Sequence, residues 1–410
     1  MTLGRIVRVA FVLLLAAVFG VSLPQAAHAQ SGHPGRLPDV EALVWYELTR
    51  SGNANRVSAV EVLTNGHLTI AGIKITYRLA TVADPTSRLR LRAIAIASAA
   101  FAAAPALDQV HLSGFYLEEG AFDYRRRDVT FSAAFRRKDI AEPRAVTRVW
   151  THPALSAPTP DERIKTLETR RYPGESRRVG PEPGLLFAGP VNEWPGSAQR
   201  FDNPRGDAAT HRLPIRVIFR GGQSTRAVAL TFDDGPDPIY TTLLLDTLER
   251  LGLRATFFLI GDRVEAFPYF ARDIVAAGHE LGNHSFHHVN LARLQPADLE
   301  HEIGATQQVI QQVTGVVPQY FRPPGGNYNR AVLHTVSQHG LTTVFWTDNP
   351  ADYSGAGTAA LEAKLLGRIS NGGIILLHQG VEDTIRTLPR AIDTLRQRGY
   401  AIVAVSALPR

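Results

Sequence analysis

The stretch that decides the fold is AVALTFDDGP, residues 227–236. A short apolar run of this length, rich in residues that favour strands, predicts a buried strand. The run leads directly into Asp233 and Asp234, and Gly235-Pro236 then favours a turn. In parallel β/α folds the functional residues collect at the carboxyl ends of the strands. The stretch therefore predicts a strand that carries two carboxylates at its functional end.

The same pattern repeats from about residue 214 to the end of the chain, where apolar runs alternate with amphipathic stretches. The predicted strands are residues 227–232, 255–260, 280–283, 319–321, 342–346, 373–377 and 401–405. The predicted helices are residues 240–251, 263–277, 296–313, 329–338, 358–369 and 384–398. Five of these helices are followed by glycine at the position where a helix ends: Gly252, Gly278, Gly315, Gly340 and Gly399. This alternation predicts an α/β fold with about seven parallel strands, and the periodicity leaves open whether they close into a barrel.

Four more predicted strands lead into polar residues. These residues are His284 and His288 after the third strand, Arg322 after the fourth, Asp348 and Asp352 after the fifth, and His378 after the sixth. Because the carboxyl ends of parallel strands meet at one edge, we expect these side chains to lie together.

Asp234, His284 and His288 are a candidate metal site. A spacing of four residues on a helical turn would place both imidazoles on one face. Two histidines and one carboxylate leave coordination positions open for water and substrate. Each motif also has an ordinary explanation on its own: Asp234 as part of an Asp-Gly turn, and the two histidines as a chance pair. The chain has no cysteine, which excludes a thiolate zinc site, an iron–sulfur cluster and a cysteine nucleophile.

The other candidate residues are Asp233, Arg322 and His378. Adjacent residues in a strand point in opposite directions, so one of Asp233 and Asp234 would bind a metal while the other faces a reacting water. Arg322, followed by two prolines, is held rigidly against a carboxylate or lies in a plain surface turn. His378 at a strand end favours an acid–base role over a core histidine. We expect His287 to be a surface histidine.

The first residues predict export. Arg5 and Arg8 precede an apolar run at residues 11–23, and Ala27-His28-Ala29 is a small-x-small cleavage pattern. These features are typical of a signal peptide over residues 1–29, and the run is shorter than a membrane span needs. A transmembrane anchor is the alternative. We expect a periplasmic or secreted protein with no stable membrane span after cleavage.

The remaining N-terminal half shows two textures. Residues 30–139 predict a small α/β module of unknown role, with strands at 68–79, 110–117 and 128–135, a helix at 86–104 and a loop at 118–127. Residues 140–213 are rich in Pro, Gly and Arg and predict a linker. Residues 214–410 then form the predicted catalytic domain.

The composition is that of an ordinary globular protein, with 44% hydrophobic and 20% charged residues. It excludes a wholly disordered chain, a collagen-like repeat and a disulfide scaffold. The net charge is +6. Export argues against a nucleic-acid partner, and an acidic cell-surface polymer or a merely solvated basic surface explains the charge.

The C-terminal half, from about Val228 to Val405, resembles the polysaccharide deacetylase family, also called carbohydrate esterase family four or the NodB-homology domain. All five motifs of that family occur in its order. They are TFDDGP at residues 231–236, H-[ST]-x-x-H at residues 284–288, R-P-P-x-G at residues 322–326, the pair Asp348 and Asp352 followed by Tyr353, and Leu376-Leu377-His378.

The resemblance implies a distorted (β/α) barrel of about seven strands and one divalent metal ion, expected to be Zn²⁺. Asp234, His284 and His288 would bind that ion. Asp233 would be the general base and Arg322 would orient it. His378 would be the general acid, tuned by an aspartate of the fourth motif, for which we expect Asp352. Leu376 would line the pocket for the acetyl methyl group.

Two positions depart from the family pattern. Gly325 stands where the family has an aromatic residue, and it would still supply a backbone N–H to the oxyanion. Tyr353 replaces the family's tryptophan. Both changes reduce aromatic bulk in the sugar-binding groove, which favours peptidoglycan over chitin as the substrate.

The sequence thus predicts a metal-dependent hydrolase that removes N-acetyl groups from an envelope or extracellular polysaccharide. Peptidoglycan, chitin-like oligomers and poly-N-acetylglucosamine all fit. One alternative is an O-acetyl esterase acting on xylan or another wall polymer, and a second is a non-catalytic glycan-binding envelope protein. The sequence does not predict the oligomeric state.

Overall fold

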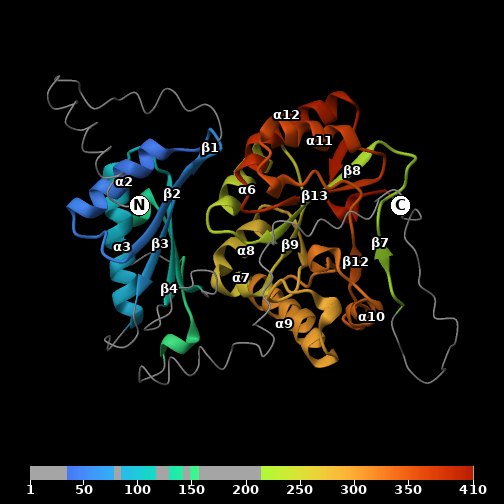
Figure 1. Ribbon diagram of the computed structural model, residues 1–410, viewed down its shortest axis with the longest axis horizontal. Coiled ribbons are helices and arrows are strands. Elements are labelled where there is room, and N and C mark those ends of the chain that lie inside the picture. The colour runs from blue at the N-terminus through green and yellow to red at the C-terminus, as the bar shows by residue number, and fades with distance from the viewer. Residues whose placement is uncertain (1–34, 78–84, 117–128, 142–147, 157–213, 410) are drawn as a thin grey trace. The chain divides into compact units, whose positions relative to one another are not determined.

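The computed structural model describes residues 35–77, 85–116, 129–141, 148–156 and 214–409 (Figure 1). It divides into two compact units, one within residues 1–172 and the other within residues 173–410. The predicted signal peptide, the predicted loop at 118–127 and most of the predicted linker lie outside the described residues. Within those residues, a search for helices with the length and apolar character of a membrane span finds none.

The first unit is a six-stranded sheet with two long helices. Its strands, in spatial order, are β1 (Gly35–Arg36), β2 (Val57–Thr64), β3 (Thr69–Tyr77), β4 (Gln109–Tyr116), β5 (Val129–Arg136) and β6 (Val149–Thr151). Its helices are α2 (Pro38–Arg50), α3 (Pro85–Ala103) and the short α4 (Arg137–Ala141). Strands β3 and β4 are parallel and are connected through α3, as a parallel pair requires. The other neighbours are antiparallel.

Both long helices pack on the same face of this sheet (Figure 1). Val44 of α2 and Ile96 of α3 join Ile73, Leu112 and Phe131 of the sheet in one buried cluster. The α/β character predicted for this region is confirmed, and the predicted helix and three strands match α3, β3, β4 and β5 within about two residues at most ends.

The predicted linker begins too early. Strand β6 pairs with β5 through Ser132 and Trp150, and Leu155 just beyond it is buried in the core of the first unit. Helix α2 and strand β2 were not predicted. Residues 140–213 are rich in proline, and β6 is only three residues long, so the composition of the region gave no sign of this strand.

The second unit alternates strands and helices. Its strands are β7 (Val217–Ile218), β8 (Ala227–Gly235), β9 (Thr256–Leu259), β10 (Glu280–Asn283), β11 (Tyr320–Phe321), β12 (Thr342–Val344), β13 (Gly373–His378) and β14 (Ala401–Val403). Its α-helices are α6 (Tyr240–Arg250), α7 (Gly261–Ala266), α8 (Pro268–Ala276), α9 (Pro296–Thr314), α10 (Arg330–Gln338), α11 (Thr358–Arg368) and α12 (Glu382–Gln397).

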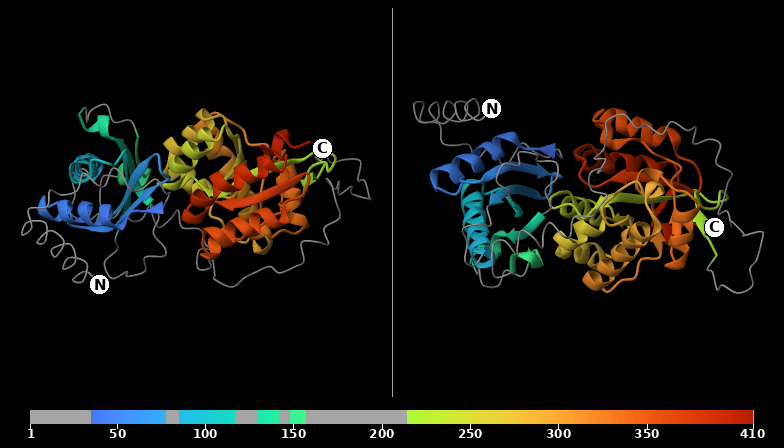
Figure 2. Two further views of the ribbon diagram at one scale, coloured as in Figure 1. Left: turned by 90° about the horizontal axis from the view of Figure 1, so that it is seen from above. Right: turned by 60° about the horizontal axis from the view of Figure 1, so that its bottom comes forward.

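These strands form one curled parallel sheet. Their order is β13-β8-β9-β10-β11-β12-β7, and β14 also pairs with β8. Just after β12, Asp348 bridges to Ile375 of β13, where the Leu376 N–H donates to the Asp348 carbonyl over 2.8 Å. This bridge brings the two sides of the sheet toward each other. Figure 2 shows the unit from two further directions, with helices around its strands. The predicted parallel, curled architecture is confirmed.

Alternation along each strand separates the interior of the curl from its outer face. On β8, Val228 and Leu230 pack with helix residues such as Leu388 of α12. Ala229 instead belongs to an inner cluster with Phe258. Because side chains alternate, the inner positions of each strand continue in steps of two toward its carboxyl end.

The predicted elements of this unit need two corrections. The predicted helix at 263–277 is two helices, because Phe267 leaves the helical conformation and Pro268 starts α8. Strand β7 was not predicted because two residues are too short for a periodic signal. The five predicted helix-ending glycines all have positive φ, between 63° and 80°.

Candidate active site

The two carboxylates at the end of β8 face the same place. The pairing of β8 with β9 shifts between Phe232 and Gly235, which is a bulge, and Asp234 has a φ of 67°. A bulge re-aims side chains at a strand end. Asp233 Oδ2 therefore lies 3.6 Å from His284 Nε2, and Asp234 Oδ1 lies 3.4 Å from the same atom. The expectation that adjacent carboxylates point in opposite directions was wrong here because the strand is not extended at Asp234.

His284 and His288 lie on a loop after β10, not on the helical turn that their spacing predicts. Ser285 has a φ of 64° and His288 a φ of 55°, so the chain passes twice through the left-handed region. The two imidazole centroids are nevertheless 5.1 Å apart. The spacing was informative, but the loop brings the rings together by a different local route.

The tautomer of His284 follows from its partner. Its Nδ1 lies 2.8 Å from the backbone carbonyl of Arg322, which can only accept a hydrogen bond. Nδ1 therefore carries a proton, and Nε2 is the ring nitrogen that faces the carboxylates. This is the arrangement in which a neutral histidine binds a metal ion.

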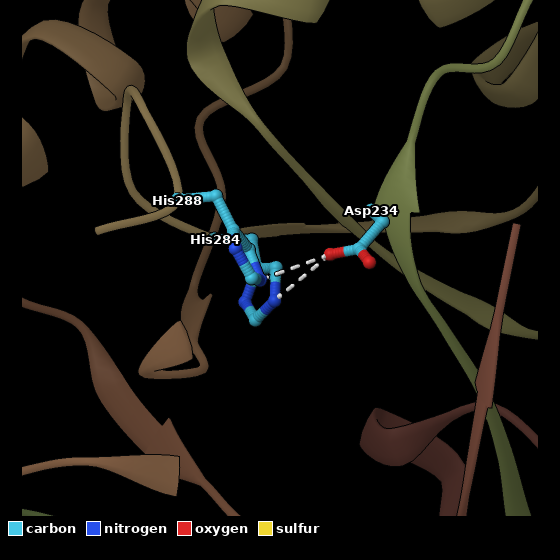
Figure 3. A group of neighbouring side chains, drawn as sticks. All are labelled: Asp234, His284 and His288. Carbon is cyan, nitrogen blue, oxygen red and sulfur yellow. Dashed lines mark ion pairs between the residues drawn. The ribbon is translucent and has the colours of Figure 1, made fainter. Parts of the chain in front are cut away.

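Asp234, His284 and His288 fit a divalent metal ion (Figure 3). Their ligand atoms lie within 4.8 Å of one another, and no other such group occurs among the described residues. Asp234 Oδ1 is buried and accepts no hydrogen bond from the described residues. It lies 3.2 Å from His288 Nε2. This carboxylate oxygen receives no hydrogen bond from the part of the chain that the structure describes, and it faces two imidazole nitrogens. One oxygen and two nitrogens are ligands that suit zinc and similar ions.

The charge balance around Asp234 points the same way. Burial by itself would raise the pKa of this carboxyl, but the charge of the adjacent His288, the imidazoles of His284 and His288 beside it and the charge of His378 together outweigh burial and hold the pKa well below its usual range. The group is therefore ionised and available as a ligand. The Arg263 guanidinium donates to the backbone carbonyl of Asp234 and holds the turn in place.

Arg322 is fully buried inside the curled sheet and forms an ion pair with Asp233. Its Nη1 donates to Asp233 Oδ1 over 2.7 Å and to Thr231 Oγ1 over 2.8 Å. Its guanidinium lies 4.1 Å above the ring of Phe258 and 5.7 Å from that of Trp346. The arginine predicted to lie against a carboxylate does so, and Asp233 Oδ1 is thereby occupied.

His378 ends β13 and is paired with the aspartate expected from the fourth motif. Its Nδ1 lies 2.7 Å from Asp352 Oδ1, while the His378 N–H and Thr384 Oγ1 donate to Asp352 Oδ2 over 2.8 and 2.6 Å. Burial lowers the pKa of His378, but the hydrogen bond and charge of Asp352, helped by Asp234 and Asp233, raise it to about 9. The imidazole is therefore protonated at neutral pH.

Asp348, the other aspartate of that motif, does not contact His378. It accepts a hydrogen bond from Thr347 Oγ1 over 2.8 Å, and burial raises its pKa to about 6. Its backbone forms the bridge to β13 described above.

The predicted substrate-facing residues occupy three settings. Leu376 is buried two residues before His378, so it shares the inner face of β13. Tyr353 is 53% exposed, and its ring meets that of His378 edge-on at 5.2 Å. Gly325 has a φ of 61°, and an added Cβ would approach Asn327 Nδ2 to 2.8 Å. An aromatic residue at position 325 would therefore be strained in this backbone.

Sequence reasoning missed Glu302, and it misplaced His287. His287 is largely buried and its Nδ1 lies 2.7 Å from Glu302 Oε1. The available signal was a charged residue on the apolar face of α9, next to Ile303 and one turn from Leu299 and Thr306.

Comparison with known proteins places the similarity in the second unit. The family model described as polysaccharide deacetylase matches residues 220–344. A peptidoglycan-N-acetylglucosamine deacetylase of Bacillus cereus is 36% identical over 199 residues, which cover 47% of this chain and 93% of the relative. A chitooligosaccharide deacetylase of Bradyrhizobium sp. is 35% identical over 211 residues, which cover 47% of this chain and 96% of the relative. Among solved structures, a peptidoglycan deacetylase from Bacillus subtilis is 32% identical and covers 46% of this chain and 91% of its own, with a TM-score of 0.43.

Proposed function

The chain belongs to the polysaccharide deacetylase family, and from this premise we propose that it is a metal-dependent hydrolase that removes N-acetyl groups from a glycan containing N-acetylglucosamine. One observation carries the proposal. The ligand set Asp234, His284 and His288, the Asp233–Arg322 pair and the His378–Asp352 pair come from separate strand ends and meet at one site. The names of both relatives describe removal of acetyl groups from such glycans.

Each side chain has a role that its free atoms allow. Arg322 occupies Asp233 Oδ1, so Oδ2 remains to accept the proton of the attacking water. Asp352 occupies His378 Nδ1, so Nε2 remains to protonate the departing amine nitrogen. Because the pKa of His378 is about 9, the ring holds that proton at neutral pH. A divalent ion held by Asp234, His284 and His288, which we propose to be Zn²⁺, would polarise the acetyl carbonyl and acidify the water.

We further propose that the protein is exported and acts on the cell envelope or outside the cell. The predicted signal peptide at residues 1–29 supports this, as does the peptidoglycan named for one relative. Leu376, Gly325 and Tyr353 are the residues we propose to face the substrate.

Acetate release tests the proposed reaction. The purified protein should release acetate from peptidoglycan or from chitooligosaccharides, and a chelator should abolish the release until Zn²⁺ is restored. Acetylxylan serves as the O-acetyl comparison. Release from acetylxylan alone would replace the proposal with the esterase alternative, and no release from any substrate by the metal-loaded protein would favour a non-catalytic glycan-binding protein.

Removing one ligand should remove the ion. We expect His284→Ala to lower the bound Zn²⁺ well below one ion per chain, because only two of the three ligands remain. Acetate release should fall with the metal content. The measurement is metal content after dialysis. His339→Ala is the matched control, because this imidazole pairs with Glu300, 2.8 Å away, and does not belong to the ligand set. Full occupancy in His284→Ala would remove His284 from the ligand set.

The pH profile should report the His378–Asp352 pair. Activity needs protonated His378, so it falls as the pH rises through the pKa of this residue. Asp352→Asn removes the main group that raises this pKa, so the alkaline limb of kcat/KM should move from near pH 9 toward the ordinary histidine value of 6.5. Asp348→Asn is the control, because Asp348 does not contact His378. An unmoved limb in Asp352→Asn would show that another group sets it.

A further inference from the structure

A buried carboxylate holds the loop that carries the two histidines. Glu302, on α9, is 0% exposed. Its Oε2 accepts hydrogen bonds from the backbone N–H groups of Phe286 and His287, both over 2.9 Å, and its Oε1 lies 2.7 Å from His287 Nδ1. One side chain thus binds the middle of the loop at three points. Such an arrangement satisfies a charge that would otherwise be costly to bury.

The loop needs such support because its backbone is strained. Ser285 and His288 both have positive φ, a backbone conformation that is energetically unfavourable for residues other than glycine. Strained residues persist only where their surroundings fix them. His288, whose imidazole belongs to the candidate metal set, is one of the two residues.

The contacts of the loop with α7 involve other backbone groups than its contacts with Glu302. The backbone carbonyls of Ser285 and Phe286 accept hydrogen bonds from the Gly261 and Asp262 N–H groups at the start of α7, both over 3.0 Å. The phenyl ring of Phe286 lies so close to Gly261 that an added Cβ there would come within 2.4 Å of it. Helix α7 therefore binds the carbonyl groups, whereas Glu302 binds the N–H groups of Phe286 and His287.

We propose that Glu302 is a positioning residue that holds the His284–His288 loop in its metal-binding conformation, with His287 as its side-chain partner. His287, the middle one of the three histidines in the H-S-F-H-H stretch, pairs with Glu302 and does not belong to the set of Asp234, His284 and His288. The inference deepens the proposed function and rests on its metal site. Outer residues that orient metal ligands are worth about 10- to 100-fold in metal affinity.

The test measures metal binding, without relying on turnover. The full-length protein is titrated with Zn²⁺ against a chromophoric chelator, and the visible absorption of its Co²⁺ form reports the ligand geometry. Glu302→Ala removes all three hydrogen bonds and should raise the Kd for Zn²⁺ about 10- to 100-fold and alter the Co²⁺ absorption. Glu302→Gln keeps an acceptor oxygen for the backbone N–H groups, so it should lie between the wild type and Glu302→Ala.

Leu395→Ala separates positioning from general destabilisation. Leu395 is fully buried on α12, and its truncation costs stability without touching a hydrogen bond of the loop. Its Zn²⁺ affinity and Co²⁺ absorption should match those of the wild type. An equal loss of affinity in Leu395→Ala would overturn the inference.

The remaining outcomes are distinct. If Glu302→Ala binds Zn²⁺ within twofold of the wild type with an unchanged Co²⁺ spectrum, only this inference fails. If Glu302→Ala does not fold, Glu302→Gln decides by the same two measurements. If the wild type binds neither ion, the proposed metal-dependent function fails and the inference fails with it.

Discussion

Replacing Asp233 with Asn is expected to lower kcat/KM for deacetylation by about 10²- to 10⁴-fold while the metal ion stays bound, because general-base catalysis contributes about that much. The amide cannot take up the proton of the attacking water. Asp233 lies 3.6 Å from His284 Nε2 but is not in the ligand set, so metal content should be unaffected.

The structure indicates that this variant keeps its fold. An Asn side chain retains an oxygen that can accept the hydrogen bond now given by Arg322 Nη1 to Asp233 Oδ1 over 2.7 Å. Acetate release and metal content are measured together. Asp246→Asn, which removes the charge that Asp246 offers to the exposed Arg250 of α6, is the matched control and should behave as the wild type. Near-normal turnover in a metal-loaded Asp233→Asn protein would assign the base to another residue.

The sequence predicted the alternating parallel architecture of the second unit, and it named the side chains that the structure brings together in the candidate site. Parallel strands meet at one edge, so the polar residues that follow the strands had to lie together once the alternation of strands and helices was recognised. His378 and Asp233 illustrate this. Their strands, β13 and β8, are far apart in the sequence, yet the two residues are register partners in the sheet.

The local geometry of the site could not be predicted because it departs from regular structure. The periods of strands and helices assume repeating backbone angles. Asp234, Ser285 and His288 all have positive φ, which no pattern in their side chains signals. The predictions that the two carboxylates point in opposite directions and that His284 lies on a helical turn were therefore wrong. The predicted ligand residues are nevertheless the ones that the structure brings together.

The first unit was harder to predict because its helices and strands do not show clean periods. Strand β3 is buried along nearly its whole length, and α3 is rich in alanine, so both are recognisable. Helix α2 mixes charged residues with its buried Val44 and Leu48. Its signal depends on packing against α3 and β2, which the sequence alone does not show.

Removing one partner of the buried Arg322–Asp233 pair should destabilise the second unit. Arg322 is 0% exposed, and removing one partner of a buried ion pair costs about 3–5 kcal/mol because the other charge stays buried and uncompensated. We therefore expect Arg322→Met to lower the free energy of unfolding by about that amount, measured by urea unfolding of the purified protein. Acetate release should also fall, since Asp233 loses the group that orients it.

A double-mutant cycle distinguishes the pair from the packing of the arginine stem. The guanidinium also contacts Phe258, so Arg322→Met alone loses both kinds of interaction. In Arg322→Met combined with Asp233→Asn, neither charge of the pair remains buried. The double variant should therefore regain part of the stability that Arg322→Met loses. We expect a coupling free energy of about 1–3 kcal/mol between the two positions. If the two single losses simply add, the buried pair contributes little, and the rigidity of Asp233 must come from its strand and from its bulged neighbour Asp234.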